Sequence, residues 1–96
     1  MKPTAVGRPA FPLAVLARNV AWGKKFARAM GWEPEEVKYV TNEAHLRSFG
    51  PGTMVFELAG WTDTFSTEQV NAVAHQLMFA KRRGVHVFYA KAEDLI

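Results

Sequence analysis

Hydrophobic positions recur along the chain at two spacings, and each spacing predicts a different element. From residue 13 to residue 30, apolar side chains follow the three-to-four-residue spacing of an amphipathic helix. The predicted buried stripe of this helix is Leu13, Leu16, Val20, Ala27 and Met30. Gly31 follows the stripe and predicts a left-handed residue that ends the helix.

Three short apolar runs predict strands at residues 37–40, 53–58 and 85–90. The last run, Val-His-Val-Phe-Tyr-Ala, is nearly continuous in apolar residues, which is typical of a strand covered on both faces. Asn42 predicts an N-cap for one or two helical turns over residues 43–48. Ser66 and Gln69 predict a capping box that opens a second long helix. The predicted buried stripe of that helix is Val70, Val73, Ala74, Leu77 and the stem of Lys81.

A strand, a crossover helix and a further strand in succession predict parallel pairing of the runs at 53–58 and 85–90. We therefore expect an α/β fold, with a small three-stranded parallel sheet and flanking helices in a reduced Rossmann-like arrangement. Residues 1–10 contain two prolines and a glycine without periodicity, and they predict an irregular N-terminal arm. Residues 11–96 are expected to form a single α/β domain.

Charge is distributed unevenly along this fold. Residues 1–32 carry six basic side chains and no acidic one, whereas the remaining residues carry six basic and nine acidic side chains. The two parts, +6 and −3, give the formal net charge of +3. The helical phase places Arg18, Lys24, Lys25 and Arg28 opposite the predicted stripe, with Trp22 at its border. Lys2 and Arg8 extend the charge into the arm. A basic helix face of this kind is expected to contact an acidic surface.

Several classes of chemistry are absent from the sequence. The chain has no cysteine, which excludes disulfides, thiolate nucleophiles and zinc–thiolate sites and fits a reducing, cytoplasmic compartment. The three histidines, His45, His75 and His86, match no metal-ligand spacing. No apolar run approaches the ~20 residues of a membrane span. We expect no enzyme activity, no cofactor, no metal site and no membrane contact.

The loop between the second predicted strand and the second long helix is the candidate ligand site. Open α/β sheets bind ligands at the carboxyl ends of their strands, and this loop leads from such an end into a capped helix. Its candidate residues are Trp61, Thr62, Asp63, Thr64 and Ser66. The alternative is structural: Asp63 and Ser66 organise the loop while Trp61 seals the end of the sheet.

Two further residues, His75 and Phe79, point away from the predicted stripe of the second long helix. An exposed phenylalanine beside a histidine predicts a contact surface. The alternative is that another helix covers this side.

The chain also resembles a known group of proteins in the run Trp32-Glu33-Pro34 to Tyr39-Val40-Thr41, in Leu46-Arg47, and from Gly52 to the Gly60-Trp61 pair. In this pattern it is similar to the small α/β proteins encoded by tailed bacteriophages of actinobacteria. The resemblance covers about residues 13–90. It implies a compact α/β fold and a role in host takeover, and it supplies no catalytic residues.

The sequence favours a non-enzymatic interaction protein, with a phage accessory role among the possibilities, that binds a host or self partner through a basic helix face. Candidate partner-binding residues are Arg8, Arg18, Trp22, Lys24, Lys25, Arg28 and Phe79. An acidic protein partner is favoured over nucleic acid, and self-association remains open. The first alternative is a nucleic-acid-binding module that uses the N-terminal arm and first helix. The second alternative is a small-molecule site at the loop after the second predicted strand.

Overall fold

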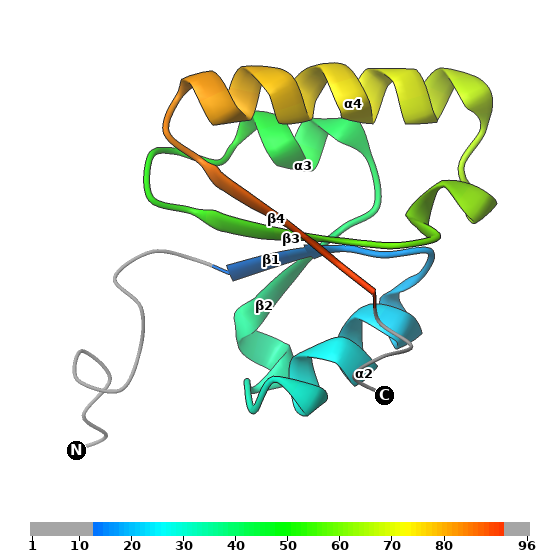
Figure 1. Ribbon diagram of the computed structural model, residues 1–96, viewed down its shortest axis with the longest axis vertical. Coiled ribbons are helices and arrows are strands. Elements are labelled where there is room, and N and C mark those ends of the chain that lie inside the picture. The colour runs from blue at the N-terminus through cyan, green and yellow to red at the C-terminus, as the bar shows by residue number, and fades with distance from the viewer. Residues whose placement is uncertain (1–12, 92–96) are drawn as a thin grey trace.

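The computed structural model describes residues 13–91, in which strands and helices alternate along the chain (Figure 1). The strands are β1 (Leu13–Leu16), β2 (Val37–Val40), β3 (Met54–Leu58) and β4 (His86–Ala90). The helices are α2 (Val20–Ala29), α3 (Glu43–Arg47) and α4 (Thr67–Arg82). Two short 3-10 helices, η1 (Pro34–Glu36) and η2 (Trp61–Thr64), lie in the connections. The predicted N-terminal arm lies outside the described residues.

The four strands form one parallel sheet in the order β2-β1-β3-β4. The α/β class and the parallel pairing of β3 with β4 are confirmed, but the sequence predicted three strands rather than four. The additional strand is β1, which lies in the centre of the sheet between β2 and β3.

The predicted helix over residues 13–30 is wrong in its first third. Residues 13–17 are all buried, as a central strand covered on both faces requires. Leu13 and Leu16 happen to have helical spacing, and a short apolar run cannot be assigned from periodicity alone. The helix begins only at Val20, and its N-cap is Asn19, whose side-chain oxygen accepts a hydrogen bond from the Trp22 backbone N–H.

The buried side of α2 also differs from the prediction. Its buried residues are Gly23, Phe26 and Ala27, whereas Val20 and Met30, both predicted in the stripe, are exposed. The stripe was phased on Leu13 and Leu16, which belong to the strand, so the predicted phase is displaced. The end of the helix is confirmed, because Gly31 has a φ of +81°.

The helices cover the two faces of the sheet unequally (Figure 1). One core cluster lies between the sheet and the pair α3 and α4, and includes Leu16, Leu46 and Val73. The other lies between the sheet and α2, and includes Val15, Phe26 and Leu58. The direction of the connections explains this division. The crossover from β1 to β2 runs one way along the sheet and the next two run the other way, so crossovers of one hand place α2 opposite α3 and α4.

The remaining helix predictions are largely confirmed. Asn42 caps α3, and Ser66 and Gln69 form a reciprocal capping box at α4. In α4, Val73 and Leu77 are buried as predicted and Val70 is half-buried. Ala74 and Lys81 are exposed, and Ala80 is buried instead. The buried side of α4 is turned because α3 packs along it and adds Leu46 and Phe49 to the same core.

The expectation that the last strand is covered on both faces is wrong. β4 is an edge strand, and His86, Phe88 and Tyr89 are exposed. The apolar composition of β4 is therefore not explained by burial on both faces of the sheet.

Candidate functional site

The solvent side of α2 carries three cations. Lys24, Lys25 and Arg28 are exposed, and their spacing places them within roughly 100° of arc, opposite the buried residues of the helix. The first turn of α2 contains no acidic residue. The sequence predicted this basic face, and the structure confirms it for these three residues. We call Lys24, Lys25 and Arg28 the α2 basic face.

Trp22 borders this surface. It is half-buried, and two cations lie over its ring: Arg18, 5.2 Å from the ring centroid, and Lys25, 5.4 Å from a ring centroid. A cation held over an indole face gains an attraction of roughly 0.5–1 kcal/mol at an exposed site. These contacts fix the edge of the basic face against the body of the protein.

The sequence predicted Arg18 on the helix, but the residue lies in the connection between β1 and α2. Its guanidinium forms an ion pair with Asp63 at 3.4 Å. It also packs on Gly60, where a Cβ would lie 2.6 Å from the Arg18 Nη2. Gly60 has a φ of +87°, so glycine serves both the turn and this close approach. Arg18 therefore joins the α2 basic face to the loop after β3.

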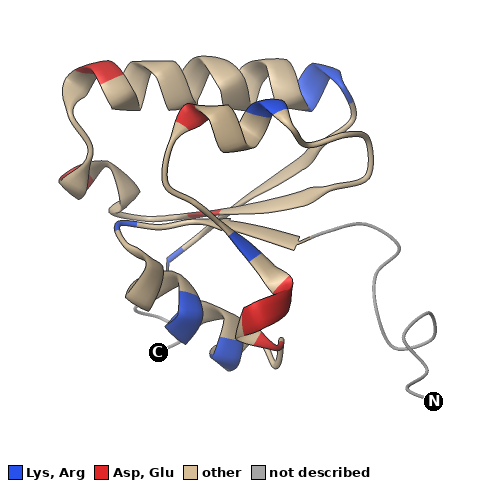
Figure 2. Cartoon of the chain, turned by 180° about the vertical axis from the view of Figure 1, so that it is seen from behind, with Lys and Arg blue, Asp and Glu red and all other residues tan. Residues whose placement is uncertain are grey.

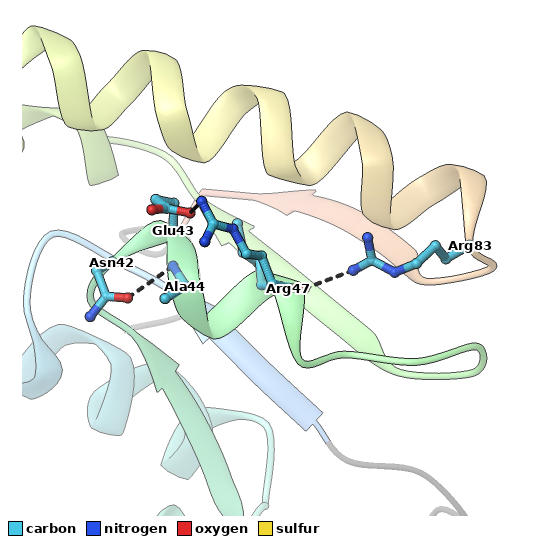
Figure 3. Close-up of polar contacts among 6 residues, drawn as sticks. Asn42, Glu43, Ala44, Arg47 and Arg83 are labelled. Carbon is cyan, nitrogen blue, oxygen red and sulfur yellow. Dashed lines mark hydrogen bonds and ion pairs between the residues drawn. The ribbon is translucent and has the colours of Figure 1, made fainter.

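The three cations of the α2 basic face have no carboxylate within ion-pair distance among residues 13–91. On the other side of the sheet, Arg47 and Arg83 are engaged within the protein, whereas Lys81 is exposed and no described carboxylate lies within ion-pair distance of it; Figure 2 shows charge on both sides. Arg47 pairs with Glu43 at 2.8 Å on α3 (Figure 3). Arg83, at the end of α4, donates hydrogen bonds to the backbone oxygens of Leu46 and Phe49, and Figure 3 shows its guanidinium reaching toward α3. The α2 basic face thus gathers three exposed cations on one helix side, none of them in an ion pair within residues 13–91.

One predicted partner-binding residue, Phe79, does not join this surface. Phe79 is 44% exposed, but it lies on α4, across the sheet from α2 (Figure 1). Arg82 lies over the Phe79 ring, 6.0 Å from its centroid. His75, on the same helix, is also exposed, so of the two alternatives the sequence left open, coverage by another helix does not apply to His75 within residues 13–91. Arg8 lies outside the described residues.

The candidate ligand loop has most of its polar groups engaged within the protein. The Trp61 indole is buried and donates a hydrogen bond to a Glu57 carboxylate oxygen at 2.8 Å, so it is not free to stack on a ligand. The Thr64 hydroxyl donates to the Arg18 backbone oxygen, and Ser66 caps α4. Asp63 is paired with Arg18. Of the five loop residues, only Thr62 makes none of these contacts, and it is exposed.

An open pocket of about 240 Å³ lies beside this loop, where the carboxyl ends of β1 and β2 approach the start of α4. Its lining residues are Ala17, Arg18, Asn19, Val40, Thr41, Thr64, Phe65 and Gln69. Thr64 is the one candidate loop residue among them. Arg18 was predicted only as a partner-binding residue, and sequence reasoning did not place it, Ala17 and Asn19 at this rim because it did not find β1, whose carboxyl end they follow. The sequence signal for β1 would have been the short apolar run at residues 13–17 followed by Asn19, the N-cap of α2.

Two ionisable groups near these surfaces have altered pKa values. Burial raises the pKa of Tyr39, which donates its hydroxyl proton to the Pro34 backbone oxygen at 2.7 Å. The Arg28 charge opposes this shift and the Glu35 charge adds to it. Burial, and then the Lys38 charge, lower the pKa of His45. The His45 Nδ1 accepts a hydrogen bond from the Thr41 N–H, which also requires a neutral ring. Neither group belongs to a nucleophile–base set.

Comparison of the chain with protein-family models, with curated proteins and with solved structures returned no significant match. The resemblance to phage proteins therefore stays a prediction. Within residues 13–91 no group of three potential metal-ligating side chains is gathered in one place. No helix in this part of the chain has the length and apolar character needed to cross a membrane.

Proposed function

We propose that this chain is a non-enzymatic interaction protein that docks an acidic segment of a partner protein on the α2 basic face. The proposal rests on one observation: the cations of the α2 basic face are exposed, and no described carboxylate neutralises them. Lys24, Lys25 and Arg28 share one side of a short helix, and no carboxylate of residues 13–91 lies within 4 Å of them. Unpaired charges on one face favour a partner of opposite charge by steering its encounter and fixing its orientation.

An acidic protein segment suits this surface better than nucleic acid does. Three cations neutralise about three phosphates, which is well below the 6–10 contacts of strong duplex binders. Glu33, Glu35 and Glu36 follow α2 directly and would repel a phosphate backbone that continued past the helix. Arg47, on α3, and Arg83, at the end of α4, lie across the sheet from α2 and cannot extend the same track.

The small-molecule alternative has weaker support. The pocket at the carboxyl ends of β1 and β2 is smaller than the roughly 300 Å³ at which ligand pockets usually begin. Its charged lining residue, Arg18, is already paired with Asp63.

Two further elements belong to the same proposal. The strand order reverses between β1 and β3, which supports a reduced Rossmann-like arrangement. The resemblance to phage proteins supports an accessory role in the host cytoplasm, and the lack of cysteine suits that reducing compartment.

The test is fluorescence anisotropy with a labelled acidic peptide of alternating Glu and Leu, compared with a DNA duplex. The variant Lys24→Glu/Arg28→Glu reverses two charges of the α2 basic face. The matched control, Lys81→Glu/Arg82→Glu, makes the same change in net charge on α4. Circular dichroism checks that both variants fold.

We expect the α2 variant to weaken peptide binding about tenfold or more, because like charges then face each other. The α4 variant should bind within about twofold of the wild type, since it touches only the distant field. Equal losses in both variants would contradict a specific face. Tighter binding of the duplex, with affinity falling steeply between about 50 and about 200 mM salt, would replace the proposal with the nucleic-acid alternative.

A further inference from the structure

The outer edge of β4 is an open strand edge. The His86 N–H donates to the Thr53 oxygen and the Ala90 oxygen accepts from the Ala59 N–H, both at 2.8 Å. Since backbone groups alternate along a strand, those of Phe88 also point toward β3, and those of Val87 and Tyr89 point outward. No strand among residues 13–91 pairs with this side of β4.

Within residues 13–91, this edge lacks the devices that normally protect one. Natural edge strands carry lysine, proline, bulges or a covering element. The opposite edge strand, β2, has the exposed Lys38 in its centre. β4 reads His-Val-Phe-Tyr-Ala, without lysine, arginine, acidic residue, proline or glycine. Its two most outward aromatic side chains, Phe88 and Tyr89, are 44% and 65% exposed.

Exposed rings flank the edge on both faces of the sheet. Phe88 is on the α2 side, where it stacks on Phe56 with centroids 5.0 Å apart. Successive side chains of a strand alternate, so Tyr89 is on the side of α3 and α4. An occupant of this edge would therefore add backbone hydrogen bonds and cover a ring on each face.

We propose that this occupant is a second copy of the chain, paired antiparallel through β4 about a twofold axis at Phe88. In this register Val87 of one copy lies opposite Tyr89 of the other. The outward backbone groups of both copies then meet as hydrogen-bonded pairs. Phe88 lies opposite Phe88 of the second copy in a non-hydrogen-bonded pair, where side chains are closest.

Charge favours a second copy at this edge. In a twofold dimer, a charged residue near the axis lies close to the same residue of the second copy and repels it. A surface that pairs with itself is therefore favoured when its centre carries no charge. β4 meets this condition, whereas the α2 basic face would repel itself. Growth also stops at two copies, because the outer strand of the resulting sheet on each side is β2 with its Lys38.

The pairing is independent of the proposed docking function, and it places both α2 helices on the same face of one continuous sheet. The interface is small. Two partly exposed rings and one strand edge lie at the low end of specific interfaces, below about 1,200 Å² in total. A dimer that dissociates on dilution is therefore expected.

Sedimentation velocity over about a hundredfold range of protein concentration tests the association directly, because a dimer population depends on concentration. Phe88→Lys places a charge at the axis and should raise the dimer dissociation constant about tenfold or more. Phe79→Lys is a matched control, because Phe79 has the same exposed fraction, 44%, but lies on α4. Tyr89→Lys, at a more exposed position, repeats the test where the fold tolerates lysine more easily.

The absence of cysteine allows a second readout in an otherwise native chain. Non-hydrogen-bonded partners have Cα atoms about 4.5 Å apart, which is within the range of a disulfide. Phe88→Cys should therefore form a disulfide-linked dimer on mild oxidation much faster than Phe79→Cys does. A chain that stays monomeric at the highest concentration would overturn the proposal. A dimer weakened equally by Phe79→Lys, or cross-linked faster through position 79, would overturn it too.

Discussion

The two faces of the sheet are buried by different means. On one face, α3 and α4 lie side by side and close the core, and Arg83 ties the end of α4 to the backbone of α3. On the other, the single helix α2 lies against β1 and β2, since Gly23 faces Val15 and Tyr39. The remainder of that face is covered by aromatic rings rather than by a helix: Phe26, Trp32, Phe56 and Phe88, with neighbouring centroids 5.0–5.8 Å apart.

The difference follows from the number of strands. In the order β2-β1-β3-β4 there are three crossovers, and their directions place one helix on one face and two on the other. The face with one helix has apolar surface left over at β3 and β4. The ring series fills it progressively, from Phe26, which is 1% exposed, to Phe88, which is 44% exposed. Burial therefore decreases toward the edge at which we propose a second copy.

The largest expected effect separates the two ends of this ring series. Phe26→Ala should lower the free energy of unfolding by about 3–5 kcal/mol, because it leaves a cavity under α2. Phe88→Ala should cost about 1 kcal/mol or less, since much of its ring already contacts solvent. Urea denaturation in dilute solution, where a weak dimer is dissociated, measures both. Equal losses would mean that something covers the outer end of the series even in the monomer.

The closeness of α2 to the sheet is tested by Gly23→Ala. Alanine should favour the helix by about 1 kcal/mol. However, the new Cβ would lie 2.6 Å from the Tyr39 Cδ1, and the Tyr39 ring is held by its hydrogen bond to Pro34. We expect a net loss of about 1–3 kcal/mol in unfolding free energy. In a Tyr39→Ala background the same substitution should become neutral or stabilising. A loss unchanged by that background would show that Tyr39 is not the obstacle.

Local signals in the sequence were sufficient for most elements. The caps Asn42 and Ser66 and the terminator Gly31 act within a few residues, so they can be identified without knowledge of the fold. β1 was missed for the opposite reason. Residues 13–17 are a strand because β2 and β3 pair with them on either side, and that pairing is not visible in the segment itself.

The candidate site was also predicted only in part: local spacing gave its charges, but not the position of its helices relative to the sheet. The charges of Lys24, Lys25 and Arg28 follow from helical spacing, and the sequence predicted their common face. The separation of Phe79 from that face depends on which side of the sheet each helix covers, which only the strand order decides. The exposure of Phe88 and Tyr89 also depends on strand order, because an apolar strand looks the same in sequence at the centre or at the edge.

On the face covered by α3 and α4, Arg83→Met should lower the unfolding free energy by about 1–2 kcal/mol. The substitution removes the hydrogen bonds that the charged guanidinium donates to the Leu46 and Phe49 backbone oxygens. Arg82→Met is the matched control. Arg82 is exposed and lies over the Phe79 ring, and its side chain forms no hydrogen bond or ion pair within residues 13–91, so its loss should stay within about 0.5 kcal/mol. Thermal unfolding of the two variants compares them directly. Similar values would mean that α3 is held by apolar packing alone.

The smallest expected effect is a pH dependence of the unfolding free energy. It originates at α3, on the face of the sheet covered by α3 and α4. Because the pKa of His45 is lowered in the folded protein, the unfolded chain takes up the proton first as the pH falls below about 6.5. The stability contribution of neutral His45 is complete above that pH and is lost as the pH falls through the lowered folded value.

Unfolding free energy measured from pH 7.5 to 5.5 should therefore decrease in the wild type and change less in His45→Gln, whose side chain does not titrate in this range. Lys38→Gln should reduce the wild-type slope, since the Lys38 charge is the second cause of the shift after burial. A slope that His45→Gln leaves unchanged would assign the pH dependence to another group.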